Sequence, residues 1–423
     1  MVRPEPNAFI LLPFAVLLLA IALAPIALRR HWEIHYHKLC AGLAAITCSY
    51  YVFALNSGGR VLHAGFEYVN FMIVVGAFFV IAGGIHLRVR GHGRPIVNTA
   101  FLLGGALLGN LIGTTGASML LIRPWIAMNR NHFAGMHLVF FIFIVSNIGG
   151  ALLPVGPPLF LGYLKGVPFW WALQRCWLPW GVTLGVVLVL FFVVDTLHCR
   201  ARVRSGNEAT SSSADGWHCD GAINFLFMLA LLAALVVAPA GWRELIMTAI
   251  AFAAYFVTPR QIHRANEFNF VPLKEIAWIF LGIFGTMIPV LDYMEIHAGD
   301  LGLRSDLQFY WGTGVLSALL DNAPTYLTFL AGALGLHGLN MDNTQDMSAF
   351  IAAHDHQLVA ISLGATCFGA LTYIGNGPNL LVKAIAEHAK VKTPSFFSYV
   401  FKFALPVLVP IFVLISILFF RKS

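Results

Sequence analysis

The sequence has few charged residues. Only 11% of its 423 residues are Asp, Glu, Lys or Arg, whereas a typical soluble domain carries about 25%. Hydrophobic residues make up 59% of the chain, and the mean hydropathy is +0.78. This shortage of charge excludes a soluble globular protein. The apolar segments are continuous rather than alternating, which argues against a membrane β-barrel and predicts an all-α polytopic membrane protein.

Cysteine is also scarce. The six cysteines, at positions 40, 48, 176, 199, 219 and 367, are scattered along the chain, several of them in apolar runs. Their number and spacing do not form a disulfide framework. No small-residue cleavage motif follows the first apolar segment, so we expect that segment to be a spanning helix rather than a removed signal peptide.

Long apolar runs dominate what is present. Since a bilayer core of about 30 Å needs about 20 apolar residues per helix, we expect about ten transmembrane helices, near 8–28, 39–56, 68–87, 133–164, 168–196, 222–241, 243–258, 273–298, 351–388 and 395–420. Two further apolar stretches, 96–129 and 307–335, contain Gly/Thr or Asp/Asn/Pro residues near their centres. We expect these two stretches to be re-entrant hairpins.

The distribution of Lys and Arg predicts the orientation. If the N-terminus lies outside and both hairpins enter and leave on the same side, most of these residues fall in inside loops, as the positive-inside rule requires. This bias explains the net charge of +7 and the pI near 9.2. We therefore expect a multi-pass protein of the cell inner membrane, with the lipid bilayer as its surroundings and no nucleic acid as a partner.

The two interrupted stretches are related to each other. GNLIGTTGASMLLI (109–122) aligns without gaps on SALLDNAPTYLTFL (317–330), and SNIGGALLPVGPPLF (146–160) matches TCFGALTYIGNGPNLL (366–381). The opposite orientation of the halves predicts inverted repeats, over 1–196 and 222–423, joined by a mobile cytoplasmic linker over 197–221. Such repeats are typical of secondary transporters, whose sites lie where discontinuous helices meet.

Side chains with oxygen atoms gather at these interruptions. The candidate substrate or ion ligands are Asp321, Asn322, Thr325, Thr114, Thr115, Ser118, Ser146, Asn147, Thr372, Asn376 and Asn379. Oxygen ligands suit a hard cation such as sodium, whereas helix N-termini nearby favour an anion. Asp321 is the most informative of these residues, because a carboxylate inside an apolar membrane segment costs free energy and usually has a function. It could instead cap a hairpin helix or pair with Arg123.

Four motifs together resemble the ion transporter superfamily, which includes NhaD-type sodium/proton antiporters and citrate or arsenite permeases. They are GTTGASMLLIRP (113–124), SNIGGALLPVGPPLFLGYLKGVPF (146–169), DNAPTYLTF (321–329) and YIGNGPNLLVKAIAE (373–387). The resemblance implies a scaffold domain with a homodimer contact and a transport domain that moves as an elevator. It also implies that residues of these motifs line the site. One departure stands out, because Pro157 replaces the acid expected before the second proline of the first break.

These observations predict a sodium/proton antiporter in which Asp321 binds a proton and Na⁺ or Li⁺ in turn, with Asp321, Asn147 and Asn376 as sodium ligands. The alternative is a citrate, dicarboxylate or arsenite transporter on the same scaffold, which would show a cationic or amide-rich cavity beside the hairpin tips. A membrane metalloenzyme built on His31, His35 and His37, in an expected cytoplasmic loop, is a third hypothesis. We expect no enzymatic activity and no cofactor.

Several charged residues lie within or near the predicted spans. Arg123 and Arg175 lie in apolar context and need partners that the sequence does not name. Glu295 lies near the end of a predicted span, where we expect it to face water. For the nearby Asp292 there are two alternatives: it faces water at the end of the span, or it belongs to a proton path to Asp321.

Overall fold

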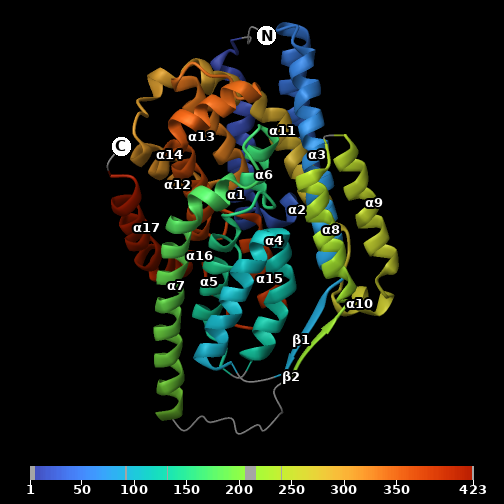
Figure 1. Ribbon diagram of the computed structural model, residues 1–423, viewed down its shortest axis with the longest axis vertical. Helices are drawn as coiled ribbons and strands as arrows, with labels where there is room; N and C mark the ends of the chain where they lie inside the picture. Colours follow the sequence, from blue (N-terminus) through green and yellow to red (C-terminus); the bar gives the residue numbers. More distant parts are fainter. Residues whose placement is uncertain (1–4, 91–92, 131, 205–215, 240, 422–423) are drawn as a thin grey trace.

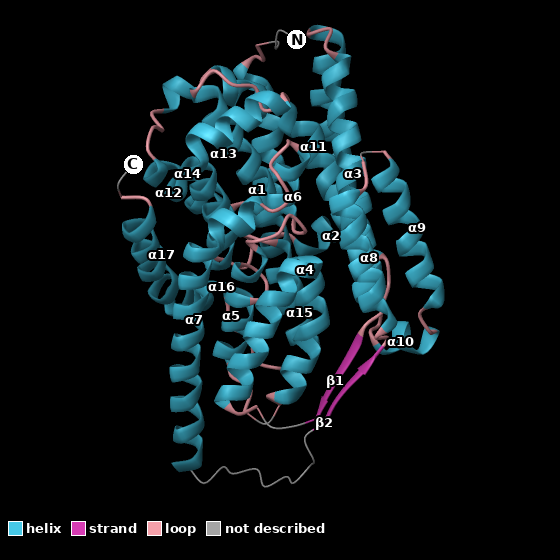
Figure 2. Cartoon of the chain, viewed as in Figure 1, coloured by secondary structure: helices cyan, strands magenta, loops and turns pink. Residues whose placement is uncertain are grey.

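Helices carry almost all of the regular structure (Figure 2). The computed structural model describes residues 5–421 except 91–92, 131, 205–215 and 240. Within this part of the chain, six helices are long and apolar enough to cross a membrane: Ala8–Pro25, Gly58–Gly83, Pro95–Met128, Trp171–Arg202, Val271–Ile296 and Phe396–Phe419. The molecule is therefore a helical, multi-pass membrane protein. The predicted number of ten spans stays a prediction.

The first half of the chain begins with a short 3-10 helix, Ala8–Leu11. It then forms α1 (Leu12–Ala27), α2 (Arg29–Ser49), α3 (Gly58–Gly83), α4 (Pro95–Met128), α5 (Gly135–Ile144), α6 (Pro157–Leu164) and α7 (Trp171–Arg204). A π-helical turn, Tyr50–Ala54, extends α2, and a 3-10 turn, Ile148–Gly150, lies between α5 and α6.

The second half is also mostly helical. It forms α8 (Ile223–Val237), α9 (Trp242–Val257), α10 (Arg260–Ala265), α11 (Val271–Ile296), α12 (Asp306–Leu319), α13 (Asn322–Leu336), α14 (Thr344–Phe368), α15 (Gly377–His388), α16 (Phe396–Ser398) and α17 (Leu405–Phe419). Short 3-10 turns lie at Ala298–Leu301 and Gly369–Leu371, and a π-helical stretch, Tyr399–Ala404, leads into α17.

The interrupted segments occupy the middle of the molecule. In Figure 1, α3, α8 and α9 stand on one side and α7 and α17 on the other, with α4, α5, α6 and α15 between them. Helix α4 contacts α15 and the 3-10 turn at Ile148–Gly150, while α13 contacts α6, α11 and α14. The two stretches predicted to be hairpins, and the two segments predicted to be broken, therefore lie against one another.

Two sequence expectations about local structure are wrong. Residues 29–38, expected to be a loop, belong to α2, which starts two residues after α1 ends. No Gly or Pro stands between Arg29 and Ala41 to stop a helix. The structure also contains two strands that an all-α prediction lacks, β1 (His86–Arg90) and β2 (Gly216–Asp220).

The two strands pair antiparallel, with His86 opposite Asp220 and Arg90 opposite Gly216. They form a ribbon at one end of the molecule, close to α10 (Figure 1), and we call this end the ribbon end. The expected linker is therefore ordered at both sides, because its first residues extend α7 and its last residues form β2. Its central part, 205–215, lies outside the described residues.

Candidate functional site

Helix α4 is interrupted at Gly113. Its φ of +74° and ψ of 155° break the helix, so that a second arm begins at Thr114. Only glycine adopts this backbone conformation at low cost. A Cβ at this position would also lie 3.3 Å from the carbonyl oxygen of Val155, just before α6. The start of the second arm is thus set directly beside the start of α6.

The α12–α13 turn has a comparable break. Helix α12 ends at Leu319, and Leu320 and Asp321 are extended before α13 begins. The Oδ1 of Asp321 accepts a hydrogen bond from the Ala323 amide at 3.0 Å, so Asp321 is the N-cap of α13. The Thr325 hydroxyl donates to the Asp321 carbonyl oxygen at 2.9 Å. The capping role considered from the sequence is therefore present.

Asn322 follows Asp321 and is almost fully buried, with 4% of its surface exposed. Its Oδ1 has no hydrogen-bond partner within the described part of the chain. Burying an amide oxygen without a hydrogen-bond donor costs free energy. Such an oxygen is able to accept a hydrogen bond or to coordinate a hard cation.

Three asparagines join the two broken segments. Asn147, between α5 and α6, donates from Nδ2 to Asn379 Oδ1 at 2.8 Å, and Asn376 donates to Asn147 Oδ1 at 3.2 Å. Asn376 also donates to the Ser146 carbonyl oxygen at 2.8 Å. All three side chains are buried. We call Ser146, Asn147, Asn376 and Asn379 the amide cluster.

Thr372 and Ser118 extend this network to the interrupted helices. The Thr372 hydroxyl donates to the carbonyl oxygen of Ala318 in α12 at 2.6 Å. Ser118, on the second arm of α4, lies with its Oγ 2.8 Å from the Ser146 Oγ. The amide cluster is therefore tied to both interrupted helices, and it reaches the Asp321 turn through α12.

Most of the residues predicted for the site meet at this junction. Thr114 lies beside the 3-10 turn, since a Cβ on Gly150 would fall 2.3 Å from its methyl group. Thr115, its neighbour, is half-buried. Of the three predicted sodium ligands, Asn147 and Asn376 contact each other, while Asp321 bonds the start of its own helix.

The junction has the chemistry of a polar, weakly charged site. At the two breaks, residues 146–158 and 369–379 supply amides and hydroxyls but no carboxylate, and Pro157 stands where an acid was expected. Helices α6, α13 and α15 and the second arm of α4 all begin here. The positive dipole ends of α6, α15 and the second arm of α4 favour an anion, whereas the start of α13 is capped by the Asp321 carboxylate.

A cavity of about 210 Å³ lies beside the second arm of α4, which is several times the ~30 Å³ that one water molecule occupies in the liquid. Its walls come from α3, β1, the 266–269 loop, the second arm of α4 and α15. The lining residues include Phe79, Gly83, His86, Gly116, Met119, Leu120, Arg123, Asn266, Glu267, Phe268, Asn269, Leu381 and Ile385. This cavity could not be predicted from the sequence, because the segments that form its walls are far apart along the chain.

The structure supplies the partners that the sequence could not name. Arg123 donates to the Asn266 carbonyl oxygen at 2.6 Å and to Glu267 Oε2 at 2.5 Å. Arg175 pairs with Asp355 at 3.1 Å. Arg123 does not pair with Asp321, so that sequence alternative is wrong.

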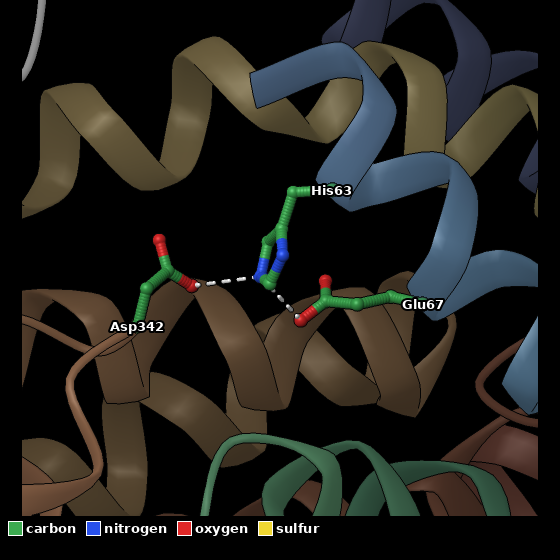
Figure 3. Close-up of side chains that lie close together, drawn as sticks. All are labelled: His63, Glu67 and Asp342. Atoms are coloured by element: carbon green, nitrogen blue, oxygen red, sulfur yellow. Dashed lines mark ion pairs between the residues drawn. The ribbon is translucent and has the colours of Figure 1, made fainter. Parts of the chain in front are cut away.

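A network of charged side chains lies near the opposite end of α3 and was not predicted. Lys165, directly after α6, places its Nζ 2.6 Å from both Glu67 Oε1 and Asp342 Oδ1. His63 lies between the same two carboxylates (Figure 3), at 3.3 Å from Glu67 and 3.7 Å from Asp342. Arg60 bonds both Asp342 and Asp292. We call these residues the ion network.

The ion network resembles a metal site only in its residue types. The ligand atoms of His63, Glu67 and Asp342 lie within 4.8 Å of one another. The Lys165 ammonium already neutralises both carboxylates, so the group does not fit a metal ion. A sequence signal existed in the His63 and Glu67 pair, four residues apart within an apolar helix.

One further expectation fails at the ion network, and the metalloenzyme hypothesis gains no support from the described residues of α2. Glu295 does not face water, since it is 9% exposed and accepts a hydrogen bond from the Met341 amide, and Asp292 is fully buried. His31, His35 and His37 are not gathered around a common point. Within the described residues, the only His/Cys/Asp/Glu group close enough to share an ion is the one in the ion network.

The comparisons with known proteins agree with a transport role. A family model described as "Putative citrate transport" matches residues 5–420. The search of curated proteins gives no match.

Proposed function

The chain belongs to the "Putative citrate transport" family, and from this premise we propose that it carries citrate or a related small carboxylate across the membrane in exchange with, or together with, a cation. The match covers nearly the whole chain, and the fold is helical and multi-pass. The protein is therefore a secondary transporter and not an enzyme. The substrate and the coupling ion are the proposed part.

The observation that carries this proposal is the amide cluster at the junction of the broken helices. A carboxylate substrate needs N–H and O–H donors and a positive field. Asn147, Asn376 and Asn379 each donate two amide hydrogen bonds to oxygens of the protein. A substrate carboxylate therefore binds these amides by replacing one of those acceptors, and the helix N-termini supply the positive field. A cation exchanger is expected to place carboxylates among these amides, and the residues at the two breaks, 146–158 and 369–379, include none.

Asp321 is proposed to bind the coupling cation. It lies at the start of α13, next to the buried and unpartnered Oδ1 of Asn322. A carboxylate and an amide oxygen can hold sodium or lithium together, or the carboxyl group can hold a proton instead. In this assignment Asn147 and Asn376 serve the anion rather than the cation.

Sodium/proton exchange is the second candidate, and Asp321 is the observation that favours it. An acid that holds either a proton or a sodium ion suffices for exchange without any anion. The family description favours the carboxylate instead. We also propose that the protein moves as an elevator and forms a homodimer. It would lie in the inner membrane with its N-terminus on the outer side.

Uptake into liposomes tests the proposed function. Purified protein is reconstituted, and labelled citrate, succinate and arsenite are supplied with an imposed sodium or proton gradient. We expect gradient-dependent uptake of citrate or another carboxylate. Proton movement on sodium addition, without uptake of any anion, would instead establish the exchanger.

A further inference from the structure

The cavity runs along the second arm of α4. Its lining residues Gly116, Met119, Leu120 and Arg123 recur three or four residues apart and so share one helical face. Ser118, which bonds Ser146 of the amide cluster, lies on the same arm but on the opposite face. The amide cluster and the cavity therefore lie along the same arm, and the cavity reaches Arg123 near the far end of that arm.

Arg123 meets a loop that is held firmly in place. The side-chain amide of Asn266 donates to the carbonyl oxygens of Gly83 and Ile85 at 2.8 Å each, and its Oδ1 lies 2.6 Å from His86 Nδ1. Phe268 packs against Gly83 so closely that a Cβ there would fall 2.2 Å from its ring. The loop between these two anchors is thus fixed to α3 and β1.

Glu267 lies between the two anchors in an unusual backbone conformation. Its φ is +48°, in the left-handed region that non-glycine residues rarely adopt. Such strain persists only where the surroundings impose it, and it is often found at functional positions. The result of the strain here is that the Glu267 carboxylate bonds the guanidinium of Arg123 at the cavity wall.

The Arg123–Glu267 ion pair is exposed enough for another carboxylate to replace Glu267. The side chain of Arg123 is 41% exposed and that of Glu267 is 78% exposed. Ion pairs with this much contact with water are weak. A guanidinium also binds carboxylates in a forked, two-point geometry that does not depend on where the carboxylate comes from.

We propose that Arg123 is a transient binding site for the substrate carboxylate on the path between the amide cluster and the ribbon end, and that Glu267 is a tethered carboxylate that occupies this site until the substrate displaces it. A substrate with two or three carboxylates can take the place of Glu267 while its other groups contact the cavity. When the substrate leaves, Glu267 returns and neutralises Arg123. This inference rests on the proposed function.

The test uses a property that a purely structural ion pair does not have. Arg123→Gln and Glu267→Gln break the same pair, so a structural role predicts similar effects of the same sign. The proposal predicts opposite effects on citrate affinity, because one variant removes the site and the other removes the competitor. Equilibrium binding of labelled citrate to the purified full-length protein in detergent reads this directly, since both ends of the path are then accessible.

We expect Glu267→Gln to bind citrate about three- to tenfold more tightly than the wild type, and Arg123→Gln about tenfold more weakly or worse. The double variant should behave as Arg123→Gln, and Arg123→Lys, which keeps the charge but not the fork, should fall in between. Arg175→Gln, which breaks the pair with Asp355 away from the cavity, is the matched control. Size-exclusion profiles and melting temperatures establish that the variants are folded.

Two results of this experiment would overturn the Arg123 site. If Arg123→Gln and Glu267→Gln shift the affinity in the same direction, or neither differs from Arg175→Gln, the Arg123 site is overturned while the proposed function stands. If the wild type binds no citrate, succinate or other carboxylate, the proposed function fails, and the Arg123 site fails with it.

Discussion

Asp321 combines a structural and a functional position. Its carboxylate caps α13, which explains why the backbone can turn there between two apolar helices. The same location, beside the unpartnered Oδ1 of Asn322, suits a cation. The two roles are compatible, because a carboxylate has several lone pairs and a cap uses only part of them.

The charge of Lys165 is needed in the ion network. Its side chain is 4% exposed and lies between the carboxylates of Glu67 and Asp342. Burial alone would lower the pKa of Lys165, but these two charges raise it above its ordinary value, so the ammonium is retained.

Replacing Lys165 by Met should therefore destabilise the fold strongly. The change removes the buried ammonium from between the partly exposed carboxylates of Glu67 and Asp342. His63 and Arg60 remain beside these carboxylates, so the cost should lie below the value of about 3–5 kcal/mol that is typical of breaking a fully buried pair. We expect a clear fall in the Tm of the purified protein in a fluorescence melt. Lys383→Met is the control, since Lys383 pairs with Glu387 in a partly exposed contact and lies over the ring of Tyr373. Its replacement should change stability by about 1 kcal/mol or less. Equal effects of both changes would contradict this account.

The pH dependence of stability should report on Asp342. Burial alone would raise its pKa, but the hydrogen bond with His63 and the charges of Lys165 and Arg60 hold it well below its ordinary value, which is about 3.9. A carboxyl whose pKa is lowered by folding stabilises the protein above its unfolded pKa, and this contribution is lost as the pH falls toward the folded pKa.

We therefore expect the Tm to change little between about pH 8 and pH 5 because of this group, and to fall below about pH 4. Asp342→Asn should remove part of that acid-side fall while lowering the Tm at neutral pH. Asp300→Asn, at an exposed acid outside the network, is the control. A Tm profile that is the same for Asp342→Asn and Asp300→Asn would exclude the network as a source of the pH dependence.

Among the elements, α4 shows how one residue divides a helix. Gly113 places the second arm beside α6, and no other residue type fits its backbone without strain. Gly104 lies on the first arm of the same helix, where an added Cβ meets no atom within 4 Å. The two glycines therefore form a matched pair within one element.

Gly113→Ala should reduce transport sharply and destabilise the fold by about 1–3 kcal/mol, the usual cost of holding a non-glycine residue in a sparsely populated backbone region. Gly104→Ala should leave transport unchanged and should be neutral or slightly stabilising, since Ala favours helix more than Gly does. Citrate uptake and the Tm of both variants provide the measurement. Full transport by Gly113→Ala would show that the break is not required.

The sequence reveals elements to different degrees. The interruptions were predictable because Gly113, Asp321 and Pro324 stand in otherwise apolar runs. The β1–β2 ribbon was not, because each strand has only five residues and gains stability from a partner far along the chain. The ion network was hidden for the same reason, since Arg60 meets Asp292 and Asp342 only after folding.

At the scale of the whole molecule, the amide cluster depends on both halves of the chain. Ser146 and Asn147 come from the first half, and Asn376 and Asn379 from the second. The sequence predicted that these residues belong together, through the matching motifs. It could not predict which of them bond each other, because that follows from the relative rotation of the broken segments.

The orientation predicted from Lys and Arg can be tested on the whole protein. We expect an impermeant thiol reagent added to intact cells to label cysteines introduced as Asp300→Cys and Gln345→Cys, on either side of the α12–α13 pair. Both positions are exposed, and the distribution of Lys and Arg predicts that both lie on the outer side. Cys219, exposed in β2, should be labelled only after the membrane is opened. Labelling of one introduced cysteine but not the other would contradict a re-entrant hairpin.

The most direct test of the central claim is citrate uptake by Asp321→Asn in liposomes with an imposed sodium or proton gradient, beside the wild type and an Asp355→Asn control. The account predicts gradient-driven uptake by the wild type and the control. It predicts that the gradient-driven uptake by Asp321→Asn is at least about ten-fold lower than that of the wild type, a ratio that corresponds to about 1.4 kcal/mol. Equal gradient-driven uptake by Asp321→Asn and the wild type would contradict the assignment of the coupling cation to Asp321.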